Sequence, residues 1–310
     1  MTELRHISFN LGASGIKATE QLLRTVGVSA DADLHIDGVL AGLCSVTLEA
    51  DDARFPALLA ALQEQGATPL IRAERRYSDS ELAAFPWLLL RVTTAGLAGG
   101  VNLGQPYDYT RACSTCGAGA EPIPPLLAAL GSMGRKAIDR TAHDGHVIVT
   151  RQLADAIEAE GLTGVEFLPV TRAPEKSPDP RFRWMRIPGE LEPLAPTSVV
   201  ATEDRCPSCG RAGHFDALER ATELRYSGSP TDDSDFSYTW EYFGVWRRPA
   251  GVAQDFLSAE ASATAVSPAV KSVGGARLPI VSHYVRALFR RLKVRGVAFE
   301  PVWRGADSGA

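Results

Sequence analysis

Four cysteines occur in two pairs that have the spacing of metal-binding knuckles. The first pair lies in the segment 113–117, CSTCG, and the second in the segment 206–210, CPSCG. Two intervening residues let both thiolates of a pair point at one ion, and the following glycine permits the tight turn that brings backbone N–H groups towards sulfur. Two knuckles supply the four thiolates of a closed tetrahedral site. The sequence therefore predicts one structural Zn²⁺ per chain, bound by Cys113, Cys116, Cys206 and Cys209.

Thiol–disulfide redox chemistry is the main alternative use of a CxxC pair, and metal-free thiols are a third. Redox centres usually have a single CxxC at the start of a helix, where the helix dipole lowers the thiol pKa. Two CxxCG motifs fit metal binding better. The second pair follows the first at far more than the roughly 15–20 residues usual in a compact zinc ribbon. We therefore expect the ion to join two distant parts of the chain.

Histidines near these motifs are the other candidates for chemistry. His214 follows Cys209 closely, but the position where a further cysteine would complete a Cys-Cys-His-Cys knuckle holds Glu219. We expect His214 to be a neighbour of the site. His143 and His146 flank an Asp-Gly turn, where a catalytic role and a merely structural one are both open. No nucleophile elbow, phosphate loop, HExxH motif or dinucleotide fingerprint is present, so the sequence predicts no catalytic residues and no enzyme.

Composition and charge describe a globular chain with little attraction to nucleic acid. Of its 310 residues 45% are hydrophobic and 22% charged, with a net charge of −5 and a pI of about 5.7. A mildly acidic protein gains no general attraction to phosphate backbones but steers a basic protein partner towards itself. The strongest acidic run comprises Asp232, Asp233 and Asp235. We expect it to be a solvated loop.

The N-terminus, MTELRHISFN, lacks the charged and apolar regions of a signal peptide. No stretch approaches the ~18 apolar residues of a membrane span. These features predict a cytoplasmic protein with no membrane partner. Cytosolic CxxC pairs are more often metal or redox sites than structural disulfides.

Residues 1–80 predict a small α+β domain. The alternation of Ile7 and Phe9 indicates a half-buried strand, as does that of Val46 and Leu48. Apolar residues with helical spacing between these strands indicate one helix. The apolar positions of residues 55–62 indicate a second helix. Another extended stretch follows residue 69, so the expected order is strand, helix, strand, helix, strand. A capping box at Ser78 places the boundary at about residue 80.

Residues 81–310 contain an internal repeat. The segments 148–170 and 280–302 align without a gap and share the pairs Ile148/Ile280, Val149/Val281, Gly164/Gly296, Val165/Val297, Phe167/Phe299, Pro169/Pro301 and Val170/Val302. Each segment predicts a short strand, an N-cap at Thr150 or Ser282, an amphipathic helix and a second strand. The fold class predicted is α+β, with a zinc-containing module built from two related strand-helix-strand halves.

An aromatic run lies between the two copies. Its aromatic residues occupy every second position, so that in a strand they would point to the same face: Phe236, Tyr238, Trp240 and Tyr242. A strand with an aromatic face is expected. Packing in the core is the simpler interpretation, and a partner-binding patch is the alternative, because tyrosine and tryptophan are frequent at interface hot spots.

The two CxxCG motifs and the stretch TGVEFLPV at 163–170 resemble the double-CxxCG motif family of bacterial proteins, over about residues 86–310. Some members of that family act as immunity proteins against a cognate toxin. The resemblance implies that the four cysteines bind zinc and that the protein neutralises a toxin without turnover. The first 80 residues have no counterpart in it. A zinc-ribbon regulator that binds nucleic acid or transcription machinery is the alternative, and the oligomeric state stays open.

Overall fold

The computed structural model describes residues 1–10, 21–28, 34–37, 43–94, 96–142, 144–173, 175–202, 205–217, 221–228, 234–244, 246–247, 272–273 and 275–304. The described elements are mostly strands with few helices, so the chain is a mixed α+β protein. It divides into two compact units. The first comprises Met1–Glu81 with Asp216–Thr222, and the second comprises Leu82–Phe215 with Glu223–Ala310.

The first unit is a four-stranded antiparallel sheet in the order β2-β3-β1-β4. Its elements are β1 (Thr2–Asn10), a helical turn at 21–25, β2 (Leu34–Asp37), β3 (Leu43–Glu49), α2 (Arg54–Glu64) and β4 (Leu70–Arg76). Each helical segment joins two strands that have a third strand between them, which is the split βαβ arrangement of ferredoxin-like domains.

The core of this unit confirms the alternation read from β1 and β3. Ile7, Phe9 and Val46 are buried with Leu58 and Leu62 of α2. The predicted element order was wrong by one strand, because β2 had not been expected. β2 is an edge strand of four residues, whose existence depends on pairing with β3 rather than on a long local pattern.

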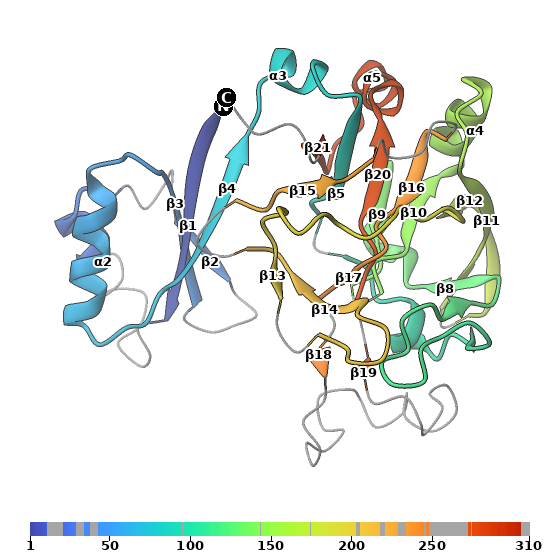
Figure 1. The fold of residues 1–310 in the computed structure, drawn as a ribbon, viewed down its shortest axis with the longest axis horizontal. Helices are drawn as coiled ribbons and strands as arrows, with labels where there is room; N and C mark the ends of the chain where they lie inside the picture. Colours follow the sequence, from blue (N-terminus) through green and yellow to red (C-terminus); the bar gives the residue numbers. More distant parts are fainter. Residues whose placement is uncertain are drawn as a thin grey trace. The chain divides into compact units, whose positions relative to one another are not determined.

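The second unit contains two five-stranded sheets, shown in Figure 1. The first has the order β8-β11-β12-β10-β9, and the second β15-β21-β5-β20-β16. The strands of the first are β8 (Leu126–Ala128), β9 (Ile138–Arg140), β10 (Val147–Thr150), β11 (Glu166–Arg172) and β12 (Ser177–Arg186). Those of the second are β5 (Trp87–Val92), β15 (Leu224–Tyr226), β16 (Phe236–Tyr238), β20 (Pro279–Ser282) and β21 (Val297–Arg304).

The two sheets agree in strand direction as well as in order. In each, the first pair is parallel and the next three pairs are antiparallel. The register also agrees at the aligned residues: Pro169 is opposite Arg183 in one sheet, and Pro301 is opposite Leu88 in the other. The central strands of the two sheets, β12 and β5, come from different places along the chain. β12 follows its sheet partner β11 along the chain, whereas β5 precedes every other strand of both sheets.

Helix α4 (Arg151–Ala159) connects β10 to β11, and helix α5 (His283–Arg291) connects β20 to β21. α4 packs on β10 and β12, and α5 packs on β20 (Figure 1). The Thr150 hydroxyl accepts a hydrogen bond from the Leu153 N–H at 3.3 Å, which is the expected N-cap. Ser282 occupies the N-cap position of α5 without capping it, because its hydroxyl donates to Asp235 at 2.6 Å instead.

Smaller elements complete the second unit. The helical ones are α3 (Asp79–Ala83), which crosses the boundary from the first unit, and the 3₁₀ turns η2 (Gly100–Leu103) and η3 (Leu130–Met133). Two pairs of short strands are β6 (Tyr107–Asp108) with β7 (Glu121–Pro122), and β18 (Trp246–Arg247) with β19 (Ser272–Val273). A three-stranded sheet consists of β13 (Ala201–Thr202), β14 (Ala212–Phe215) and β17 (Tyr242–Phe243). The cysteine pairs lie next to β7 and β14.

Candidate metal centre

The first cysteine pair lies in the connection between β6 and β7. The Gly117 N–H donates to the Cys113 carbonyl at 2.7 Å, and the Cys113 N–H donates to the Ala118 carbonyl at 2.8 Å. Gly117 has a φ of +73°, in the left-handed region that glycine adopts without strain. The glycine after the second cysteine thus closes the turn in the manner that the sequence predicts.

The second pair repeats this turn ahead of β14. The Gly210 N–H donates to the Cys206 carbonyl at 2.8 Å, and the Cys206 N–H donates to the Ala212 carbonyl at 3.1 Å. The Arg211 N–H also points at the Cys209 sulfur, at 3.5 Å. This N–H favours the thiolate form of Cys209, but burial outweighs it and raises the pKa of that thiol.

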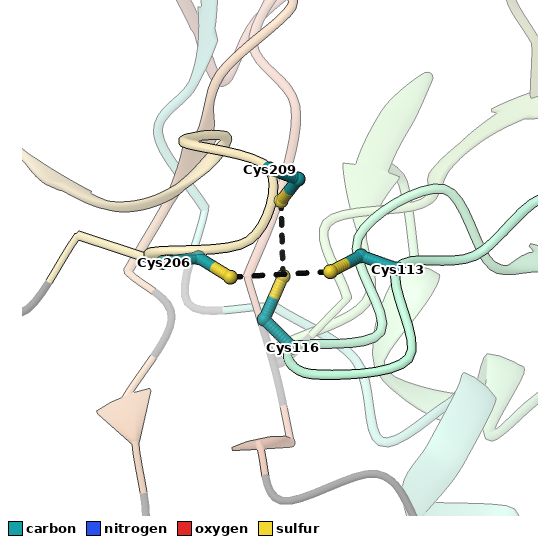
Figure 2. Close-up of side chains that lie close together, drawn as sticks. All are labelled: Cys113, Cys116, Cys206 and Cys209. Carbon is teal, nitrogen blue, oxygen red and sulfur yellow. Dashed lines mark hydrogen bonds between the residues drawn. The ribbon is translucent and has the colours of Figure 1, made fainter.

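The two turns face each other and bring all four sulfur atoms together (Figure 2). The Sγ atoms of Cys113 and Cys206 are 3.9 Å apart, and those of Cys116 and Cys209 are 3.5 Å apart. All four ligand atoms lie within 4.8 Å of one another. Tetrahedral zinc with Zn–S bonds of about 2.3 Å requires S···S separations of about 3.8 Å. The four sulfur atoms are therefore positioned to hold a metal ion.

The environment of the cysteines is largely apolar. Cys116 and Cys206 are buried, whereas Cys113 and Cys209 are partly exposed. Ala118, Ala212 and Tyr242 pack against the four cysteines. The Thr115 and Ser208 hydroxyls hydrogen-bond to each other at 2.6 Å, which joins the two turns a second time.

The thiols of the cluster differ in acidity, even within the second turn. Burial alone would raise the pKa of Cys206, but the backbone N–H groups of Cys209 and Ser208 outweigh it and lower the pKa to about 6. Burial raises the pKa of Cys116. A cation at the centre of the cluster would favour the thiolate form of all four. Four protein ligands complete a tetrahedron, so such a metal would have no open position for a substrate.

His214 lies beside the centre and is not part of the ligand cluster. Its ring Nε2–H donates to the Gly210 carbonyl at 3.1 Å, and its ring packs near Phe243. Burial lowers the pKa of the imidazole, which favours the neutral form.

The second histidine motif forms a different cluster. His146 Nε2 is 3.1 Å from the Tyr107 hydroxyl, which donates to the Asp144 carboxylate. Burial lowers the pKa of His146. Asp144 and His146 are close in sequence, but nothing in the sequence pattern had placed Tyr107 beside them. His143 lies outside the described residues. The Asp144 and His146 side chains are 10% and 16% exposed, so neither lies open on the surface.

The aromatic and acidic segments have structural contacts. Phe236 and Tyr238 are buried in the second sheet, as the core interpretation predicts. The expected continuous strand is instead two short strands, because Thr239 and Glu241 turn the chain between β16 and β17. Asp235 is not a free surface charge: its carboxylate accepts from the Thr163 N–H at 2.9 Å. Asp232 and Asp233 lie outside the described residues.

The fold and the site define a two-unit α+β protein with a cluster of four cysteines that is positioned to hold a metal ion. A comparison with protein-family models finds no match, and a search of curated proteins finds no significant match. The resemblance to the double-CxxCG family therefore stays a prediction. None of the helices in the described parts of the chain has the length and apolar character to cross a membrane.

Proposed function

We propose that the protein is a zinc-stabilised, non-catalytic immunity protein of the cytoplasm that binds and neutralises a cognate protein toxin. The observation that carries this proposal is the closed four-cysteine cluster, whose geometry suits a structural ion rather than a reactive one. The link to a toxin rests on the resemblance of the two CxxCG motifs and the 163–170 stretch to the double-CxxCG family.

Zinc is the metal that best fits this donor set. Four thiolates in a tetrahedral arrangement select zinc or iron–sulfur chemistry, and a single ion of about 2.3 Å bond length matches the sulfur separations. Elemental analysis of the purified chain should give one zinc per molecule. Two zinc ions per chain would mean that each pair recruits other ligands, and would contradict the shared site.

We also propose that the second unit arose by duplication, with one strand exchanged between the copies. We start one copy at β5 and the other at β12, and count only the strands of the two five-stranded sheets. Each copy then runs strand, CxxCG turn, three strands, helix, strand. The initial strand of each copy then lies in the sheet of the other. This proposal predicts that fragments divided between β11 and β12 fold only together. A monomeric, cooperatively folded fragment on its own would contradict it.

The immunity role is tested by co-expression. A toxin gene adjacent to the gene for this chain should kill the host when expressed alone and should be tolerated when the two are expressed together. Purified partners should form a stoichiometric complex without chemical change to either. Lack of protection by the intact, zinc-loaded protein would contradict the proposal.

A regulator that binds nucleic acid is the second candidate, because the end of α5 is cationic. Arg290, Arg291 and Lys293 are exposed there, although Arg291 pairs with Glu160. The net charge of −5 opposes general binding to phosphate backbones. Binding to DNA or RNA that weakens steeply with salt would favour the regulator, whereas absence of binding at low salt would exclude it.

A further inference from the structure

The two five-stranded sheets differ most in one connection. In the first sheet, β9 is linked to β10 through a short turn, in which Thr141 N–H donates to the His146 carbonyl at 2.9 Å. In the second sheet, Thr239 N–H donates to the Leu278 carbonyl at 3.0 Å. The threonine hydroxyls accept from His146 N–H and Leu278 N–H in the same way, at 2.9 and 3.0 Å. Residues 240–277 therefore replace a tight turn with a long connection.

Tyr242 lies at the start of this connection and contacts both cysteine turns. Its backbone N–H donates to the Arg211 carbonyl at 2.8 Å, two residues beyond Cys209. Its phenolic oxygen accepts from the Gly119 N–H, also at 2.8 Å, three residues beyond Cys116. The ring itself packs against the cysteines. One side chain thus joins two turns that come from distant parts of the chain.

The position of the Tyr242 ring is fixed by two arginines. The guanidinium carbons of Arg211 and Arg277 lie 5.3 Å and 5.7 Å from the centre of the ring. Arg211 forms an ion pair with Glu190 at 2.5 Å, and Arg277 forms one with Glu121 at 2.8 Å. Glu121 follows the first cysteine turn, so these contacts hold the ring against the same two turns that the phenol bridges.

The two residues after Tyr242 also form backbone hydrogen bonds to neighbouring segments. The Phe243 N–H donates to the Ala276 carbonyl at 2.9 Å, and the Gly244 N–H donates to the His214 carbonyl at 2.9 Å. The two ends of the connection are therefore tied to each other and to β14, which follows the second cysteine turn directly. We call Phe243, Gly244 and Ala276 the base of the connection. A shift of one cysteine turn relative to the other would move β14, Tyr242 and this base together.

We propose that Tyr242 is a positioning residue of the metal centre, and that a bound metal orders the base of the 240–277 connection through it. The inference rests on the proposed zinc site. The phenol holds the Gly119 N–H and so keeps the first turn at the correct distance from the second. The metal in turn fixes the two turns that hold Tyr242.

The test compares Tyr242→Phe with Tyr226→Phe in the full, zinc-loaded chain. Both substitutions remove one hydroxyl, but the buried Tyr226 hydroxyl has no hydrogen-bond partner within the described part of the protein. The rate of zinc transfer to a colorimetric chelator is measured for each. Tyr242→Phe should release zinc about five- to tenfold faster, because Gly119 N–H loses its acceptor. Tyr226→Phe should release it at the wild-type rate.

The outcomes separate this inference from the proposed function. A wild-type chain that binds no zinc would overturn both. A wild-type chain that binds zinc, with an unchanged rate in Tyr242→Phe or an equal acceleration in Tyr226→Phe, would overturn only the role of Tyr242. Circular dichroism of each variant shows whether faster release merely reports unfolding, which would also contradict a positioning role.

Hydrogen exchange tests the second half of the proposal. Zinc removal should increase exchange at the Phe243 and Gly244 amides in the wild-type chain, and Tyr242→Phe should show part of that increase with zinc bound. The amide of Ile148 in β10 serves as the reference within the same molecule. Equal exchange at Phe243 and Gly244 with and without zinc would show that the metal does not order this segment.

Discussion

The Sγ atoms of Cys113 and Cys206 lie 3.9 Å apart, although 93 positions separate the two residues in the chain. Their backbones form the same turn, the first between β6 and β7 and the second between β13 and β14. A metal at this point would close a very long loop, and constraining a long loop removes much of the entropy of the unfolded chain. An ion bound at this point would therefore have a large effect on stability.

Replacing Cys113 or Cys206 with serine should have the same consequence. Each change removes one ligand from a shared site, and structural zinc contributes on the order of 10–16 kcal/mol of apparent binding free energy at neutral pH. Both variants should lose bound metal and unfold at lower temperature, and chelator should no longer change their melting. Cys44→Ser, in β3 of the first unit, is the control. Metal loss in only one of the two knuckle variants would contradict a shared site.

Gly164 and Gly296 occupy matching turns, and alanine should be costly at both. Gly164 has a φ of +83°, and a Cβ there would lie 2.4 Å from the Phe236 carbonyl oxygen. At Gly296, with a φ of +80°, the obstacle is the Thr94 methyl group at 2.8 Å, which can move. We expect losses of about 3 kcal/mol for Gly164→Ala and about 2 kcal/mol for Gly296→Ala in the free energy of unfolding.

Gly161→Ala is the control for these substitutions. Its φ is +69°, but no atom lies within 4 Å of the added methyl group. Only the left-handed backbone then opposes alanine, at a cost of about 1 kcal/mol. Denaturant titration measures all three variants. An equal loss at Gly161 and Gly164 would show that the contact with Phe236 has no role.

Asp139 should be required for stability, because it joins elements of both five-stranded sheets. Its buried carboxylate in β9 accepts from Lys136 Nζ at 2.8 Å and from the hydroxyl of Thr94, which follows β5. Asp139→Ala leaves these donors without an acceptor and should cost about 2–3 kcal/mol in thermal or chemical unfolding. Asp155→Ala, in an exposed pair on α4, should change stability by less than about 0.5 kcal/mol.

Glu241 should make stability depend on pH. Burial raises the pKa of its carboxyl, although the Leu194 N–H bond partly opposes this. The folded state therefore prefers the protonated form. The stabilising contribution of that form is full below the ordinary carboxyl pKa and is lost as the pH rises through the folded pKa.

Glu241→Gln keeps an acceptor for the Leu194 N–H and removes the charge. The variant should be more stable than the wild type at pH 7, and the difference should vanish below the ordinary carboxyl pKa of about 4. Unfolding free energies across this range test the prediction. Glu158→Gln, exposed on α4, is the control. A Glu241→Gln variant that is less stable at neutral pH would contradict it.

The sequence by itself determined the features that depend on short chain segments. The CxxCG turns follow from residue spacing and a glycine at positive φ, so all four cysteines of the centre could be named. The amphipathic patterns at Leu153 and Ile157 and at Val285 and Leu288 predicted helices α4 and α5, because periodicity reports which face is buried.

Only the tertiary structure decided how these segments combine. The pairing of β5 with β20 and β21, and the matching place of β12 in the other sheet, depend on which strands meet across long stretches of chain. The bond from Gly119 to Tyr242 and the cluster of Tyr107 with His146 likewise join residues that no local pattern relates. Spacing and periodicity encode local geometry, whereas non-local contacts are selected by the packing of the whole unit. The four cysteines could therefore be predicted from the sequence as one cluster, but the contact of Tyr242 with both turns could not.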